Sequence, residues 1–169
     1  MARNVEVKLA VEGLDALRDR ARGLGAEDRG AIDQVDTYFA LPADSGARLK
    51  LREQRPGRDE LIAYRRPDET GLRTSDYRVV PVADAAATRD ALALSLGLAR
   101  RVAKRRHLLL LGRTRVHLDR VEGRGEFLEL EVVLGPDEDA AAGEREAERI
   151  LEGLGLRDRP RIAGSYGDP

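Results

Sequence analysis

The sequence contains no cysteine and no tryptophan, and only 4% of its residues are aromatic. Without cysteine, a disulfide framework and any metal site built on thiolates are excluded. The sequence has no run of 18 apolar residues, so it predicts no membrane-spanning helix. The N-terminal residues pass directly into a strand-like pattern without the apolar core of a signal peptide, so we expect a cytoplasmic protein.

An excess of charge of one sign is also lacking, because 30 basic residues are balanced by 31 acidic ones. Proteins that bind nucleic acid usually carry a basic excess, so no nucleic-acid partner is predicted. Lysine is scarce: only Lys8, Lys50 and Lys104 occur, and the other 27 basic residues are arginine. Each lysine falls on the charged face of a predicted strand. An ammonium is a compact point charge and a guanidinium is a planar fork, so the two are not interchangeable. The use of lysine at these three positions therefore indicates a binding site that requires this compact charge.

Hydrophobic periodicity predicts about eight strands and three helices. Most neighbouring strands are joined by short connections, which favours a mainly antiparallel sheet. No linker interrupts the pattern, so residues 1–169 are expected to form a single domain. The predicted strands are 4–11, 32–41, 47–53, 61–66, 72–82, 101–111, 114–121 and 125–134, and the predicted helices are 14–24, 84–96 and 137–154, with Asp84 as a possible N-cap.

Several predicted strands have one apolar and one charged face. In the segment 47–53, three basic residues alternate with leucines, so the basic side chains share one face of the strand. The signs of charge are separated by strand, whereas a solvated surface usually mixes them. Cations occupy Arg48, Lys50, Arg52, Lys104 and Arg106, and acids occupy Glu129 and Glu131.

Two architectures fit this pattern. Considered strand by strand, an antiparallel sandwich with solvated charged faces is the simpler one. The alternative is a closed barrel whose helices cover the apolar outside and whose charged faces line the interior. Burying unpaired charges costs several kcal/mol each, so such an interior must hold water and a charged ligand. Its cations suit a polyanion, and its carboxylates suit a hard divalent cation.

The motifs resemble, in order, those of the CYTH superfamily, the triphosphate tunnel metalloenzymes. This superfamily includes class IV adenylate cyclases, thiamine triphosphatases and inorganic triphosphatases. The match covers most of the chain. The matching segments are 4–8 (NVEVK, similar to the ExExK signature), 34–39 (QVDTYF), 48–53 (RLKLRE), 64–67 (YRRP), 75–77 (SDY), 102–106 (VAKRR) and 117–131 (HLDRVEGRGEFLELE).

The resemblance implies an α+β fold, an eight-stranded antiparallel β-barrel with helices packed on the outside. It implies that Glu6, Glu129 and Glu131 hold Mg²⁺ or Mn²⁺, with Asp119 as a ligand or a partner of metal-bound water. These four residues and Lys8 are the implied catalytic residues. The implied triphosphate clamp consists of Lys8, Arg48, Lys50, Arg52, Arg65, Lys104 and Arg106, with Arg115 and Arg161 as further candidates.

The chain departs from the family pattern at two positions. Asn4 replaces the first glutamate of the signature and brings no charge, which leaves open whether one metal or two are bound. Arg124 stands between two glycines where the family more often has an apolar residue. Two roles fit His117, that of a general base and that of a hydrogen-bonded structural residue. His107 is predicted to be structural. The tail pair Ser165-Tyr166 resembles a family motif to which we assign no role.

The resemblance implies an enzyme that acts on a triphosphate: tripolyphosphate, ATP or thiamine triphosphate. Hydrolysis is the first expectation, and conversion of ATP to cyclic AMP and pyrophosphate is the second. A non-catalytic protein that binds phosphate chains is the third. We expect a monomer or a homodimer. The aromatic residues could either stack on the organic group of a substrate or pack in the core or rim of the protein. These residues are Tyr38, Phe39, Tyr64, Tyr77, Phe127 and Tyr166.

Overall fold

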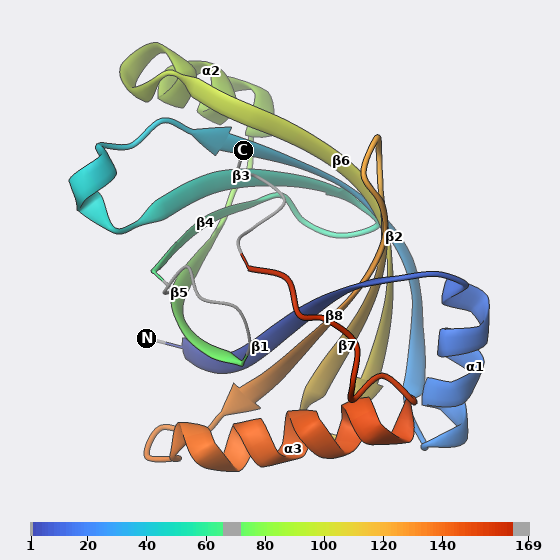
Figure 1. The fold of residues 1–169 in the computed structure, drawn as a ribbon. Helices are drawn as coiled ribbons and strands as arrows, with labels where there is room; N and C mark the ends of the chain where they lie inside the picture. The colour runs from blue at the N-terminus through green and yellow to red at the C-terminus, as the bar shows by residue number, and fades with distance from the viewer. Residues whose placement is uncertain (1, 66–71, 164–169) are drawn as a thin grey trace.

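The structure, a computed structural model, describes residues 2–65 and 72–163. Within these residues, eight antiparallel strands close into a barrel and three helices pack on its outside (Figure 1). The strands are β1 (Ala2–Val11), β2 (Glu27–Phe39), β3 (Arg48–Arg55), β4 (Glu60–Arg65), β5 (Arg73–Pro81), β6 (Leu98–Leu111), β7 (Thr114–Val121) and β8 (Gly125–Leu134). The helices are α1 (Leu14–Gly23), α2 (Ala85–Leu96) and α3 (Ala140–Gly153), and a short 3₁₀ turn spans Ala43–Ser45. Neighbouring strands follow the order β1-β5-β4-β3-β2-β6-β7-β8, and β8 closes onto β1.

The predicted elements are all present, with differences at their ends. Strands β7 and β8 have the predicted bounds. Strand β2 begins earlier than predicted because a bulge between Asp28 and Ala31, with Gly30 at φ 86°, carries the strand through a sequence that reads as a turn. Asp84 is the N-cap of α2, as predicted, and its carboxylate accepts a 2.9 Å hydrogen bond from the amide of Ala87.

The helices cover the apolar outer face of the barrel. Val5, Val7 and Leu9 of β1 are almost fully buried and share a core with residues of α1 and α3. Each such side chain contributes roughly 1.5–3 kcal/mol by leaving water. Helix α3 approaches β1 and β8 closely at Gly143, where an added Cβ would lie 2.9 Å from Val5 Cγ2. None of the described helices has the length and hydrophobicity needed to cross a lipid bilayer.

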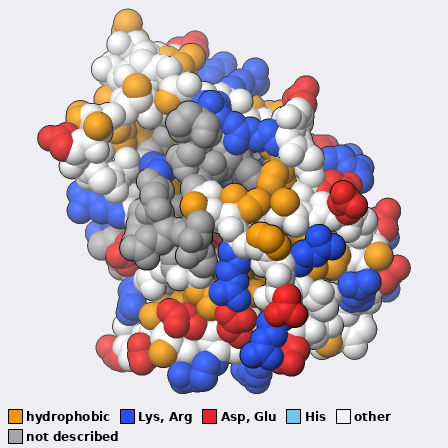
Figure 2. Space-filling view, in the orientation of Figure 1, with side chains coloured by type: hydrophobic (Ala, Val, Ile, Leu, Met, Phe, Trp, Pro, Cys, Tyr) orange, Lys and Arg blue, Asp and Glu red, His pale blue; other side chains and the backbone are white. Residues whose placement is uncertain are grey.

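The charged faces of the strands point into the barrel, so the alternative of a sandwich with solvated charged faces is wrong. Glu6 and Lys8 are 5% and 4% exposed, although they alternate along β1 with core valines. Lys104 and Arg106 of β6 are buried in the same way. The outer surface differs from this interior, because Figure 2 shows basic and acidic side chains interspersed over the visible face.

After α3 the chain runs back across β1 (Figure 1). Arg161 forms a β-bridge with Leu9, and the amide of Ile162 donates a 2.8 Å hydrogen bond to the carbonyl of Lys8. The pairing of β5 with β1 ends at Glu6. The segment that follows α3 therefore lies beside the later part of β1, at Lys8 and Leu9. Ser165 and Tyr166, to which no role is assigned, lie outside the described residues.

Candidate functional site

The barrel encloses a cavity of about 140 Å³, and every strand contributes to its lining. In a ring of eight strands, two strands four places apart lie on opposite sides. By the observed order, β8 faces β3 and β1 faces β2 across the interior. The lining residues are Asn4, Glu6, Lys8, Tyr38, Lys50, Arg52, Ile62, Tyr64, Ser75, Tyr77, Val79, Arg106, Arg115, Glu129 and Glu131.

On one side of the cavity, two cations of β3 are held in place by Asp36 of β2. Lys50 Nζ lies 2.9 Å from Asp36 Oδ2, and Arg52 donates hydrogen bonds to both carboxylate oxygens, at 2.7 and 2.8 Å. Asp36 is 1% exposed; burial opposes its ionisation, but the charges of Arg52 and Lys50 hold its pKa well below the usual range. The sequence analysis did not select Asp36. The alternation that places Gln34 and Tyr38 on the same face of β2 could have identified it.

A second buried ion pair joins β6 to β7. Arg106 donates to both oxygens of Asp119, at 2.7 and 2.6 Å, and Lys104 Nζ lies 3.4 Å from one of them. Asp119 therefore pairs with the cations of β6. Its role as a metal ligand or as a partner of metal-bound water stays a prediction. Burial and the charge of Arg106 lower the pKa of Lys104 to about 7. Its link to Asp119 only partly offsets this, because Arg106 already occupies both oxygens.

The predicted carboxylates lie together on β1 and β8. Glu6 stands opposite Glu131 in the register of the two strands, and Lys8 stands opposite Glu129. Glu129 lies 3.7 Å from Lys8 Nζ and 3.6 Å from Arg106 Nη2. Despite its burial, these cations lower the pKa of Glu129. For Glu131 the balance is reversed, because burial and the negative charges of Glu129 and Glu6 raise its pKa.

His117 of β7 points into the barrel beside these carboxylates. It is 4% exposed, and Nδ1 lies 3.7 Å from Glu131 Oε1. Burial and the nearby charge of Arg106 hold the pKa of His117 well below its usual range, so the imidazole is neutral at physiological pH. One donor atom from each of His117, Glu129 and Glu131 lies within 4.8 Å of the other two.

Four predicted clamp residues lie away from the cavity lining: Arg48, Arg65, Lys104 and Arg161. Arg65 ends β4 on the outward alternation of that strand and is exposed. Arg161 lies on the outside and donates a 2.5 Å hydrogen bond to Glu148 of α3. Arg48, the first residue of β3, lies two residues before Lys50 and points to the same side of the strand, but it does not line the cavity. The resemblance to the family suggested Arg65 and Arg161 as clamp residues, but neither side chain lies on the inner face of the barrel.

Arg115 does line the cavity and lies 3.3 Å from Glu131 Oε2. Of the aromatic residues that the structure describes, Tyr38, Tyr64 and Tyr77 reach the cavity. Lys50 Nζ lies 5.5 and 5.9 Å from the ring centres of Tyr38 and Tyr64. Phe39 instead packs in the core beneath α2. His107 is outside the barrel, paired with Asp28 at 2.6 Å, as its predicted structural role requires.

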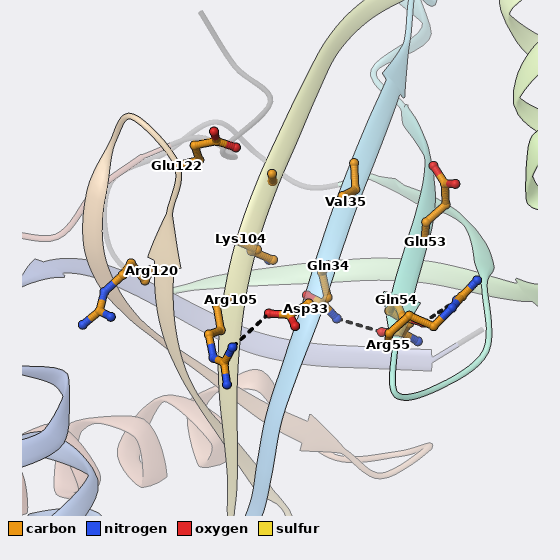
Figure 3. Close-up of a pocket in the computed structure, with 11 residues that line it drawn as sticks. Asp33, Gln34, Val35, Glu53, Gln54, Arg55, Lys104, Arg105, Arg120 and Glu122 are labelled. Carbon is orange, nitrogen blue, oxygen red and sulfur yellow. Dashed lines mark hydrogen bonds and ion pairs between the residues drawn. The ribbon is translucent and has the colours of Figure 1, made fainter.

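A separate, more open pocket lies over β2, β3, β6 and β7 (Figure 3). Charged residues of both signs line it: Arg105 lies 3.6 Å from Asp33, and Glu53 and Glu122 add further negative charge. Lys104 lines this pocket and not the barrel cavity. The balance of charge makes this pocket a poor match for a polyanion, in contrast to the barrel interior.

The comparison with known families agrees with this geometry. A profile of the CYTH domain matches residues 2–166. The chain belongs to the CYTH domain family. No curated protein matches the chain.

Solved structures share the CYTH fold over almost the whole chain. The PH1012 protein of Pyrococcus horikoshii is 25% identical, with a TM-score of 0.85 and coverage of 97% of both chains. A proposed adenylate cyclase of Vibrio parahaemolyticus is 22% identical, with a TM-score of 0.78, 96% of this chain and 94% of that chain covered. HpAC1 of Hippeastrum, a proposed adenylyl cyclase reported to have a dominant triphosphatase activity, is 14% identical, with a TM-score of 0.66 and coverage of 96% and 91%.

Proposed function

We propose that this CYTH protein is a divalent-metal-dependent enzyme that hydrolyses tripolyphosphate or an organic triphosphate. The observation that carries the proposal is one cavity inside the barrel with cations on β3 and β6 and carboxylates on β1 and β8. The cations are complementary to a chain of phosphates, and the carboxylates to a hard divalent ion. The protein would act in the cytoplasm, as a monomer or a homodimer.

The carboxylate cluster fits a metal. Glu6, Glu129 and Glu131 would hold Mg²⁺ or Mn²⁺, since both ions bind carboxylate oxygens. The raised pKa of Glu131 reflects repulsion from Glu129 and Glu6 after burial, and a bound cation would relieve that repulsion. When bound, the ion would neutralise phosphate oxygens and polarise the phosphorus centre.

The chain's own cations would bind and orient the phosphates. A cation about 4 Å from a phosphate oxygen contributes up to roughly 4 kcal/mol at an effective dielectric constant near 20. Lys50, Arg52 and Arg106 are already held in place by Asp36 and Asp119. Because these side chains are ordered before the substrate arrives, less conformational entropy is lost on binding.

Lys50→Ala should raise KM for any triphosphate substrate by roughly 10- to 100-fold, because each lost 1.4 kcal/mol of binding is tenfold. Arg52 continues to neutralise Asp36, so the variant should remain folded. Steady-state phosphate release measures the effect. Arg65→Ala is the matched control, since Arg65 is exposed and outside the cavity, and its kinetics should match wild type. Unchanged kinetics in Lys50→Ala would show that β3 does not contact substrate.

The reaction is tested by product analysis with Mn²⁺ or Mg²⁺ on tripolyphosphate, ATP and thiamine triphosphate. The proposal predicts orthophosphate release from at least one of them. Cyclic AMP and pyrophosphate from ATP would instead identify a cyclase. Tight binding without products would identify a protein that sequesters phosphate chains.

Conversion of ATP to cyclic AMP is the second candidate. A partly apolar wall made by Tyr38, Ile62, Tyr64 and Val79 lies beside Lys50 in the same cavity. Such a wall could pack against adenine while the cations hold the triphosphate. Hydrolysis needs no ordered ribose, which is why it remains the first candidate.

A further inference from the structure

His117 presents an unused nitrogen to the carboxylate cluster. Its Nδ1 is buried and has no hydrogen-bond partner among the residues that the structure describes. A buried polar atom without a partner normally costs about 1–3 kcal/mol, so such an atom in a folded protein is expected to bind water or an ion. A structural histidine would instead be hydrogen-bonded, as His107 is to Asp28.

The surroundings of Nδ1 identify the kind of ligand. Glu131 Oε1 lies 3.7 Å away, and donor atoms of His117, Glu129 and Glu131 fall within 4.8 Å of one another. Opposite ligands of an ion with 2.1 Å bonds are separated by roughly 4.2 Å. The three donor atoms are therefore close enough to converge on one ion once the side chains adjust.

We propose that His117 supplies a nitrogen ligand to the divalent ion of the tunnel and that the site therefore prefers Mn²⁺ to Mg²⁺. This inference rests on the proposed metal dependence of the enzyme and adds to it the identity of one ligand and of the ion. Mg²⁺ takes oxygen ligands in near-ideal octahedral geometry. Carboxylate, carbonyl and water ligands suit Mn²⁺ and Mg²⁺ alike, so it is the imidazole nitrogen, a ligand of transition ions, that would favour Mn²⁺ over Mg²⁺.

The test uses metal binding without substrate. Wild type and His117→Asn are titrated with Mn²⁺ and with Mg²⁺, and the bound Mn²⁺ is examined by pulsed EPR for coupling to nitrogen. Asparagine is neutral and can place an oxygen close to the position of Nδ1. His107→Asn is the matched control, because the sequence has only two histidines and His107 lies outside the barrel.

We expect wild type and His107→Asn to show coupling from a histidine nitrogen to bound Mn²⁺. His117→Asn should lose this coupling, and its preference for Mn²⁺ over Mg²⁺ should fall at least about tenfold, the lower end of the effect of altering a metal site's supporting residues. Labelling wild-type histidine with ¹⁵N should change the coupling frequency, which tests the ligand even if the variant fails to fold.

Bound Mn²⁺ without histidine coupling in wild type would overturn the inference, as would coupling that persists in folded His117→Asn. Absence of Mn²⁺ binding by wild type would overturn it too. These outcomes are separate from failure of the proposed function. Histidine-coupled Mn²⁺ in a protein that releases no product from any triphosphate would uphold the ligand and contradict the hydrolase.

Discussion

Glu131→Gln is expected to lower turnover of a triphosphate at least roughly 100-fold while leaving the fold intact, because a metal ion at such a site supplies several kcal/mol of transition-state stabilisation. The variant removes one negative charge from a cluster in which burial, Glu129 and Glu6 already raise the pKa of Glu131. Loss of that charge relieves repulsion, so the free energy of unfolding should be unchanged or slightly higher. Product release with Mn²⁺ and a thermal unfolding curve measure the two effects.

The control for this prediction is Glu122→Gln, an identical change at an exposed turn next to β7. It should retain wild-type turnover. Glu129→Gln should behave like Glu131→Gln in activity, although Glu129 also faces Lys8 and Arg106. Full activity in both cluster variants would remove the metal assignment to these carboxylates.

Asp119→Asn is expected to lower the free energy of unfolding by about 3–5 kcal/mol, because removing one partner leaves an uncompensated buried charge. Asp119 is fully buried and binds both Arg106 and Lys104. For a domain of this size, the midpoint of thermal unfolding should fall by roughly 6–20 °C. Urea titration gives the free energy directly.

Asp33→Asn provides the matched comparison. Asp33 also pairs with an arginine, Arg105 at 3.6 Å, but both side chains are about two-thirds exposed. An exposed pair of this kind contributes about 0–1 kcal/mol, so this variant should unfold nearly like wild type. Equal stability of the Asp119 and Asp33 variants would mean that the cations of β6 do not depend on Asp119.

The buried aspartates and Glu131 thus have opposite electrostatic environments within one barrel. Asp36 and Asp119 are each matched by two cations, and despite burial their pKa values are lowered. Glu131 has neighbours of its own sign, and its pKa is raised. Under the proposed function, the aspartates would hold the cations in place, and a bound cation would relieve the repulsion around Glu131.

Much of the fold could be predicted from alternation along single strands. The pattern in β1 correctly places Glu6 and Lys8 on one face and Val5 and Val7 on the other, because successive strand residues point to opposite sides. The ends of elements were less predictable. Strand β2 extends beyond its predicted start because pairing with β6 stabilises a bulge that the local sequence presents as a turn.

The sequence by itself determined the strands, the identity of their charged faces and the membership of the CYTH domain family. Only the tertiary structure decided that these faces enclose a cavity, that Asp36 and Asp119 hold the cations, and that Arg65 and Arg161 lie outside. It also decided that His117 stands beside Glu129 and Glu131. The physical reason is that alternation relates residues within one strand, whereas barrel closure and strand register determine which side chains of different strands meet.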